Sequence, residues 1–134
     1  RLHGFIPGWV LFRFTEDLKL KGYGLNTEYF SEVLHQLRHQ TFYAQIVQDA
    51  LDIPKNADTR DTRAVIKICT ALLKLLFPHV NSLDDISLDD FDNLILKPAM
   101  RYRAIIRQQL AVLDSEFSSE MPNIRLAKER FVCK

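Results

Sequence analysis

Glycine is scarce in this 134-residue sequence and is confined to one end, since all four glycines lie within the first 24 residues. A phosphate-binding loop of the form G-x-x-x-x-G-K-[ST] is therefore absent. The G-x-S-x-G and H-E-x-x-H patterns of many hydrolases and metalloproteases are absent as well. We expect that the chain cannot hydrolyse a nucleotide through a P-loop by itself, and that it is not a complete enzyme.

Cysteine is also scarce, with two residues in the chain, and long apolar runs are absent. Cys69 and Cys133 match no zinc or redox spacing; Cys69 lies in an apolar helical pattern and is predicted to be a core residue, and Cys133 to be a free thiol. Thiols without a disulfide framework favour a reducing compartment. No apolar run approaches the roughly 18 residues of a membrane span, and no signal peptide is visible. We therefore expect a cytoplasmic protein without a membrane partner.

The overall charge excludes little but offers no strong field. The formal net charge is +1, so any basic surface for nucleic acid has to be local. The hydrophobic content of 47% and the charged content of 26% are typical of a soluble globular domain. The first residue is Arg1 rather than Met, and we expect the chain to be a piece of a longer polypeptide.

The chain changes character at Asn26. Before it, Pro7-Gly8 and Gly22-Tyr23-Gly24 interrupt regular structure, and the apolar run of residues 9–12 predicts a short extended segment. After it there is no glycine, and the apolar spacing becomes helical. Residues 118–134 are predicted to form a polar tail.

Capping residues and prolines divide the helical part into four or five helices. The predicted caps are Thr27, Thr41, Asp58 or Thr59, and Ser87, and the predicted breaks are Pro54, Pro78 and Pro98, where Pro98 either kinks the fourth helix or starts a fifth. The apolar faces are Phe30, Val33, Leu34 and Leu37; Ile46, Val47, Ala50 and Leu51; Val65, Ile68, Cys69, Leu72, Leu75 and Leu76; Phe91, Leu94 and Ile95; and Tyr102, Ile106, Leu110, Leu113 and Phe117. The predicted fold class is an all-α bundle of four to five helices after a short extended segment.

Two polar clusters have a functional and a structural interpretation. His35 and His39, with Glu32 nearby, have the spacing of metal ligands on one helix, but a third ligand is missing, and we interpret them as a solvated face. Five acidic residues lie close together, namely Asp84, Asp85, Asp89, Asp90 and Asp92. They could attract a divalent ion, but they fit no EF-hand spacing and favour a helix start instead.

Basic residues cluster in two places. Lys97, Arg101, Arg103 and Arg107 predict either a phosphate-binding face or an ordinary exposed face. Arg60 and Arg63 lie in the first turn of the third helix, where the helix dipole disfavours cations. Such arginines suit an incoming phosphate. The alternative is that they pair with Asp58 and Asp61, and the residues alone do not decide between the two.

Several strings occur in a fixed order and resemble one family. They are HGFIPGW at residues 3–9, GYGL at 22–25, YFSEVL at 29–34, Arg60-Asp61, Ala64-Val65 and LLKLLFP at 72–78. Over residues 1–113 the chain resembles the Lon-like AAA+ ATPases of BREX phage-defence systems, the BrxL family. The resemblance implies that residues 1–25 hold the end of the large nucleotide-binding subdomain and a linker, and that residues 26–117 are the helical lid.

The resemblance also implies a chemistry. ATP and Mg²⁺ would be used by the parent assembly, a ring of identical AAA+ subunits that associates with DNA, whereas the fragment alone would bind no cofactor. Arg1 would be an arginine finger that reaches the neighbouring subunit's nucleotide. Arg60 would be the sensor-2 arginine, with Arg63 as the second candidate. The Walker segments and the Ser–Lys protease part are absent, so no peptidase activity is expected.

Two other functions remain as alternatives. A free-standing helical DNA-binding module would use the arginines of residues 97–107 for phosphate contacts. A protein-interaction bundle would need no ligand at all.

Overall fold

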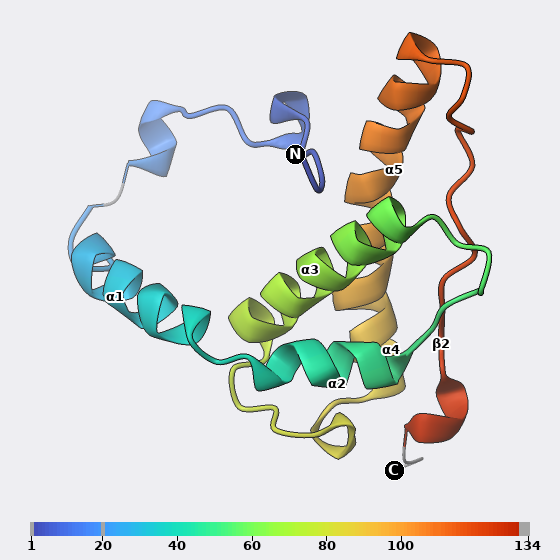
Figure 1. Cartoon of the computed structure of the whole chain (residues 1–134). Coiled ribbons are helices and arrows are strands. Elements are labelled where there is room, and N and C mark those ends of the chain that lie inside the picture. Colours follow the sequence, from blue (N-terminus) through green and yellow to red (C-terminus); the bar gives the residue numbers. More distant parts are fainter. Residues whose placement is uncertain (1, 20, 132–134) are drawn as a thin grey trace. The chain divides into compact units, whose positions relative to one another are not determined.

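The computed structural model describes residues 2–19 and 21–131 and divides the chain into two compact units (Figure 1). One unit comprises residues 1–5 and 41–134, and the other is Ile6–Gln40. The described residues are mostly helical, with one pair of two-residue strands, which confirms the predicted helical class. No helix among the described residues is long and apolar enough to cross a membrane.

The smaller unit ends in helix α1, Thr27–Arg38. Its cap is Asn26, one residue before the predicted Thr27, because the Asn26 side chain accepts hydrogen bonds from the backbone N–H groups of Glu28 and Tyr29. None of the residues of α1 is buried, although the sequence assigned them to the bundle. The apolar periodicity therefore located the helix correctly but did not show whether its apolar face is covered.

The segment before α1 is not a strand. Gly8–Val10 and Glu16–Leu18 are single 3-10 turns, so the predicted extended run is wrong at residues 9 and 10. Leu11 has extended backbone angles and follows the first turn directly.

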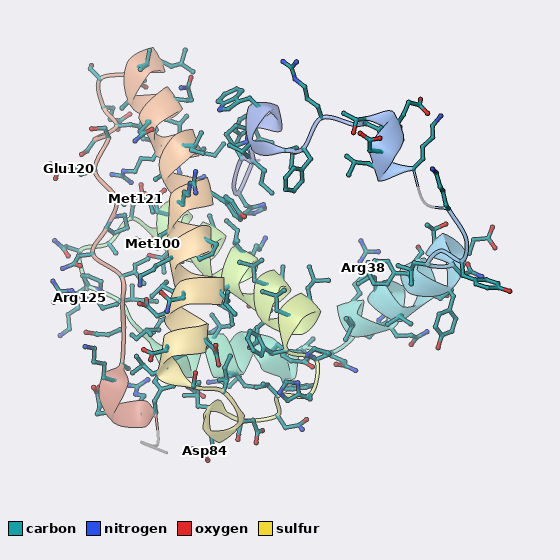
Figure 2. All side chains as sticks on the ribbon, turned by 180° about the vertical axis from the view of Figure 1, so that it is seen from behind. Arg38, Asp84, Met100, Glu120, Met121 and Arg125 are labelled. Carbon is teal, nitrogen blue, oxygen red and sulfur yellow. The ribbon has the colours of Figure 1, made fainter. Side chains whose placement is uncertain are left out.

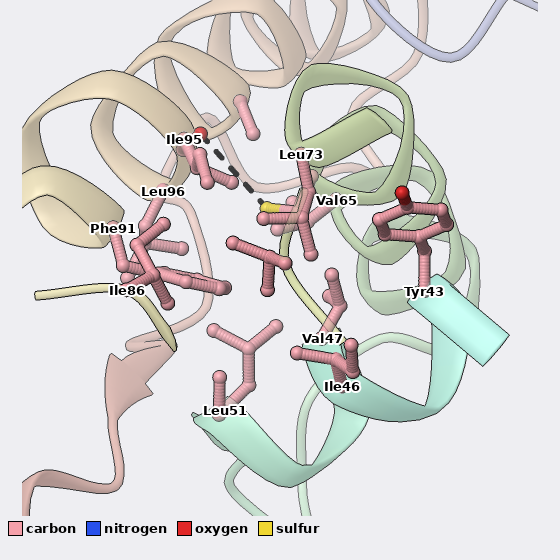
Figure 3. Close-up of a cluster of buried hydrophobic side chains, with 14 of the residues drawn as sticks. Tyr43, Ile46, Val47, Leu51, Val65, Leu73, Ile86, Phe91, Ile95 and Leu96 are labelled. Carbon is pink, nitrogen blue, oxygen red and sulfur yellow. Dashed lines mark hydrogen bonds between the residues drawn. The ribbon is translucent and has the colours of Figure 1, made fainter. Parts of the chain in front are cut away.

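Helices α2, Phe42–Ala50, and α3, Thr59–Leu76, provide much of the core of the larger unit. The buried residues of α3 include Val65, Cys69 and Leu73, which are four apart and so share one helix face. Cys69 is a core residue, as predicted, and burial raises the pKa of its thiol to about 12. Figure 3 shows the side chains of Val47, Val65 and Leu73 turned toward one another.

The helix that contains Pro98 bends without ending. The short helix α4, Leu88–Asp90, continues into a π-helical segment, Phe91–Leu96, and then into helix α5, Lys97–Leu113. Pro98 is the second residue of α5 and follows the π-helical segment directly. The π-helical segment brings Phe91, Ile95 and Leu96 into the core (Figure 3).

The apolar faces predicted for α3 and α5 include residues near the C-terminal ends of these helices that are exposed. Leu75 and Leu76 are half exposed, whereas Leu73, which was not assigned to the stripe, is fully buried. Leu75 follows Leu73 by about 200° around the helix, so the two side chains point in nearly opposite directions. Leu113 is 81% exposed at the last residue of α5, and α5 ends before Phe117 is reached.

Residues 118–131 are not a polar tail. Strand β2, Arg125–Leu126, pairs antiparallel with β1, Leu51–Asp52, and the Ala127 N–H donates to the Ala50 carbonyl at 2.9 Å. Ile124, Ala127 and Phe131 are buried. In Figures 1 and 2 this segment runs back along α5, and Met121 and Arg125 are labelled on it. Few apolar residues anchor the segment, so its composition concealed its contribution to the core.

We expect Phe131→Ala to lower the free energy of unfolding by about 3 kcal/mol, because it removes a buried ring that stands edge-on to Phe91 at a centroid distance of 5.7 Å. Urea denaturation followed by circular dichroism measures this difference. Leu113→Ala is the matched control and should cost less than about 0.5 kcal/mol, since its side chain is exposed. Equal losses in the two variants would show that the segment is not part of the core.

Candidate anion-binding site

The candidate site lies at the N-terminus of α3. Asp58 caps this helix, since its Oδ1 accepts a hydrogen bond from the backbone N–H of Arg60 at 2.7 Å. The cap fixes the start of the helix that carries Arg60, Asp61 and Arg63. Asp61 turns into the protein, whereas both arginines are exposed.

Asp61 is held by two arginines from α5. Its Oδ1 accepts from Arg103 Nε at 2.7 Å, and its Oδ2 pairs with Arg107 Nη1. Asp61 is 1% exposed and Arg103 is 6% exposed, so these charges have left water. A buried carboxylate is stable only when it is paired and hydrogen-bonded. Burial lowers the pKa of Arg103, and the nearby Asp58 carboxylate opposes that change.

This pairing decides a question that the sequence left open. Asp58 and Asp61 do not pair with Arg60 and Arg63; their carboxylates lie against Arg103 and Arg107, with Asp58 Oδ2 at 4.0 Å from Arg107 Nη1. No ion pair joins Arg60 or Arg63 to a carboxylate among the described residues.

Of the cluster at residues 97–107, for which the sequence predicts either a phosphate-binding or an ordinary exposed face, Arg103 and Arg107 belong to neither, whereas Lys97 and Arg101 are exposed. Arg103 and Arg107 turn inward to Asp61, and the ammonium of Lys97 is 2.7 Å from the carboxylate of Asp92. The spacing of Arg103 and Arg107, four apart on one helix face, was the available signal for a shared partner. Only Arg101 of this cluster is exposed and without an ion pair among the described residues.

Residues 2–5 pack against α5 and α3. The Phe5 N–H donates to the Tyr102 carbonyl at 3.2 Å, and Arg103 Nη1 donates to the Leu2 carbonyl at 3.1 Å. A Cβ atom on Gly4 would approach Ile68 Cδ1 and Tyr102 Cβ to 3.0 Å. Glycine at position 4 therefore permits the close approach of this segment.

A pocket of about 530 Å³ opens between this segment and the two helices. Its lining is basic on one side and apolar on the other, and it contains no acidic residue. It consists of Leu2, His3, Thr59, Arg60, Arg63, Ala64, Lys67, Arg103, Ile106, Leu110 and Phe117. The guanidinium carbon of Arg60 lies 6.0 Å from the centre of the Phe117 ring, within the range of a cation–π contact.

The electrostatics of the pocket favour an anion. Three arginines and one lysine line it, and one of these, Arg103, is paired with Asp61. His3 adds a titratable group: its Nε2 lies 3.3 Å from Lys67 Nζ. Partial desolvation and the charge of Lys67 lower the pKa of His3, so its neutral form is favoured. Guanidinium groups are good hydrogen-bond donors to phosphate, and the apolar side chains of the pocket can pack against an apolar or aromatic ring of a ligand.

The other sequence candidates lie elsewhere. Arg1, the predicted arginine finger, lies outside the described residues. His35 and His39 are on α1 with ring centroids 5.8 Å apart, and no group of three or more potential metal ligands is found in the described part of the chain. Among the acidic residues, Asp85 and Asp90 form helix-start contacts with Ser82 and Ser87.

Comparison with known proteins identifies the family. The family model of the ATPase domain of Lon-like protease BrxL-like proteins matches residues 1–123. The chain therefore belongs to the BrxL-like ATPase domain family.

Two curated relatives carry the name Lon-like protease BrxL. The chain is 30% identical over 118 residues to the protein of Escherichia coli O9:H4 (strain HS), a match that covers 84% of this chain and 15% of the relative. It is 32% identical over 83 residues to the protein of Bacillus cereus (strain H3081.97), with 59% and 12% covered. The chain thus spans a small part of the length of the relatives it matches.

We expect Asp61→Asn to lower the free energy of unfolding by about 3 kcal/mol, because the amide leaves the buried Arg103 charge without a counter-charge and leaves Arg107 with only Asp58 at 4.0 Å. Urea denaturation measures the loss. Asp89→Asn, a neutralisation at an exposed position, should change stability by less than about 0.5 kcal/mol. A small effect at Asp61 would mean that this carboxylate is not a buried counter-ion.

His3 should make the docking of residues 2–5 dependent on pH. Because the fold lowers the pKa of His3 below 6.5, the unfolded chain binds the proton more readily; the His3 contribution is present above pH 6.5 and is lost as the pH falls from there through the lower pKa of the folded chain. Nuclear magnetic resonance titration of the His3 ring in buffer and in urea measures the difference. Stability curves of wild type and His3→Gln should diverge below pH 6.5, and parallel curves would contradict this assignment.

Proposed function

We propose that this chain is the nucleotide-sensing lid of a phage-defence ATPase and that the pocket at the start of α3 receives the terminal phosphates of ATP. The observation that carries the proposal is that Arg60 and Arg63 line the pocket without a carboxylate partner among the described residues. An arginine in the first turn, as Arg60 is, opposes the helix dipole and is disfavoured unless an anion joins it. Membership in the BrxL-like ATPase domain family supports a nucleotide as that anion.

The proposed mechanism is electrostatic. Arg60, as the sensor-2 arginine, attracts the terminal phosphate of ATP, and Arg63, one turn further along α3, strengthens the attraction. When the phosphate leaves, the attraction ends and α3 is released, together with the helices that pack on it. Nucleotide state would thereby be coupled to movement of the bundle.

The pocket fits the phosphates of ATP but not its metal ion. None of its lining residues is a carboxylate, so these side chains supply no acidic ligand for Mg²⁺. We propose that Mg²⁺ and the P-loop contacts come from other parts of the ATPase. In place of the expectation that the fragment alone binds no cofactor, we propose that the chain alone binds ATP weakly through its phosphates and does not hydrolyse it.

The wider assignments rest on the family. Assembly with neighbouring subunits, an arginine finger at Arg1, and remodelling associated with DNA are proposed for the whole ATPase. DNA contacts are not assigned to residues 97–107, because Arg103 and Arg107 are committed to Asp61.

The smaller unit supports the existence of further partners. Trp9, Phe12, Phe14 and Tyr23 are all more than 70% exposed within Ile6–Gln40. Large exposed aromatic side chains mark surfaces that other protein parts cover. We propose that other parts of the ATPase assembly cover them.

Arg60→Ala should weaken binding of inorganic triphosphate to the chain by about 10-fold to 100-fold, as expected for loss of hydrogen bonds to a charged group. Isothermal titration calorimetry at fixed, low salt measures the affinity. Arg101→Ala removes the same charge from an exposed position outside the pocket and should change affinity less than about twofold.

In the longer ATPase that contains this segment, Arg60→Ala should abolish stimulated ATP turnover while the circular dichroism spectrum stays unchanged. Turnover equal to that of wild type would contradict the sensor assignment. Equal losses for Arg60→Ala and Arg101→Ala in triphosphate binding would show that only net charge matters.

A further inference from the structure

Arg103 is the described residue whose hydrogen bonds join three separate elements. It belongs to α5, its Nε donates to Asp61 of α3, and its Nη1 donates to the carbonyl of Leu2. The positions 2, 61 and 103 are far apart in the sequence. One buried guanidinium therefore fixes the N-terminal segment and the first turn of α3 to the same helix.

These three elements are also the walls of the anion pocket. His3 belongs to the N-terminal segment, Arg60 and Arg63 to the N-terminal part of α3, and Ile106 and Leu110 to α5. A change in the distance between the first two walls would separate Leu2 and His3 from Arg60, Arg63 and Lys67 of α3. The pocket keeps its shape only while the segment stays docked.

Arg107 shares the same carboxylate but has a different role. It pairs with Asp61 and lies near Asp58, yet it makes no hydrogen bond to residues 2–5 and does not line the anion pocket. It lines a second cavity of about 520 Å³ on the side of Pro54 and Met121. Both arginines therefore pair with Asp61, but only Arg103 also holds the N-terminal segment.

We propose that Arg103 is the positioning residue of the site: it docks residues 2–5 against the start of α3, so that the segment and Arg60 face the bound anion as one unit. The effect on anion binding rests on the proposed function, whereas the docking of residues 2–5 by Arg103 does not. Guanidinium is required because two of its N–H donors, fixed in one plane, reach Asp61 and Leu2 together. The single ammonium of a lysine cannot reproduce this arrangement.

Amide hydrogen exchange of the 134-residue chain tests the positioning role without any nucleotide. In Arg103→Lys, exchange at the Phe5 N–H, which donates to Tyr102, should rise at least about tenfold. In Arg107→Lys, the matched loss of an arginine at the same carboxylate, exchange at Phe5 should change less than about twofold. A protected Phe5 amide in Arg103→Lys, or equal exposure in both variants, overturns the proposal.

Gly4→Ala reaches the same segment without altering the buried charges. Its new Cβ would meet Ile68 and Tyr102 at 3.0 Å, so the segment should lift from α5 and the Phe5 amide should again exchange faster. This variant keeps the test decisive if Arg103→Lys does not fold. An unchanged Phe5 amide in Gly4→Ala then counts against docking by close approach and overturns the proposal.

Binding of inorganic triphosphate connects the positioning role to the site. Arg103→Lys and Gly4→Ala should each weaken affinity about tenfold, and Arg107→Lys less than about twofold. If wild type binds triphosphate and Arg103→Lys binds equally well, the positioning role is overturned while the proposed function stands. If wild type does not bind it, the proposed function fails, and the hydrogen-exchange result still decides whether Arg103 docks the segment.

Discussion

The carboxylate of Asp61 lies in the interior between two guanidinium groups, and the arrangement of the larger unit follows from that pairing. A charge buried at the first turn of a helix must find its counter-charge on a neighbouring element. Here α5 supplies two, and the start of α3 is thereby fixed to the middle of α5. Removing either side would leave an uncompensated charge away from water, which is costly.

The arginines beside Asp61 in the sequence differ from those that hold its carboxylate. Arg60 and Arg63 are one and two positions from Asp61, and side chains at these spacings do not face each other on a helix. Arg103 and Arg107 hold the Asp61 carboxylate, and Arg60 and Arg63 line a pocket without acidic residues. The arginines of α5 thus form the structural ion pairs with Asp61, and the arginines of α3 belong to the candidate binding site.

The structure uses the basic residues of positions 97–107 and those at the start of α3 differently from what their spacing suggests. Arg103 and Arg107, which suggested an exposed face, stabilise the interior, whereas the open alternative at Arg60 was resolved toward exposure. Sequence spacing shows which residues share a helix face, but it does not show which neighbouring helix that face meets. The docking of Leu2 on Arg103 has no local signal at all, since the two residues are about 100 positions apart.

The sequence by itself determined the local elements. Apolar periodicity, the Asp58 cap and Pro98 locate the helices to within a few residues, and the quoted strings identify the family, because these signals act between residues that are close along the chain. Only the tertiary structure decided which charges are paired, that residues 118–131 close the core, and that α1 buries none of its residues. Those outcomes depend on contacts between distant segments, whose free energy no local pattern records.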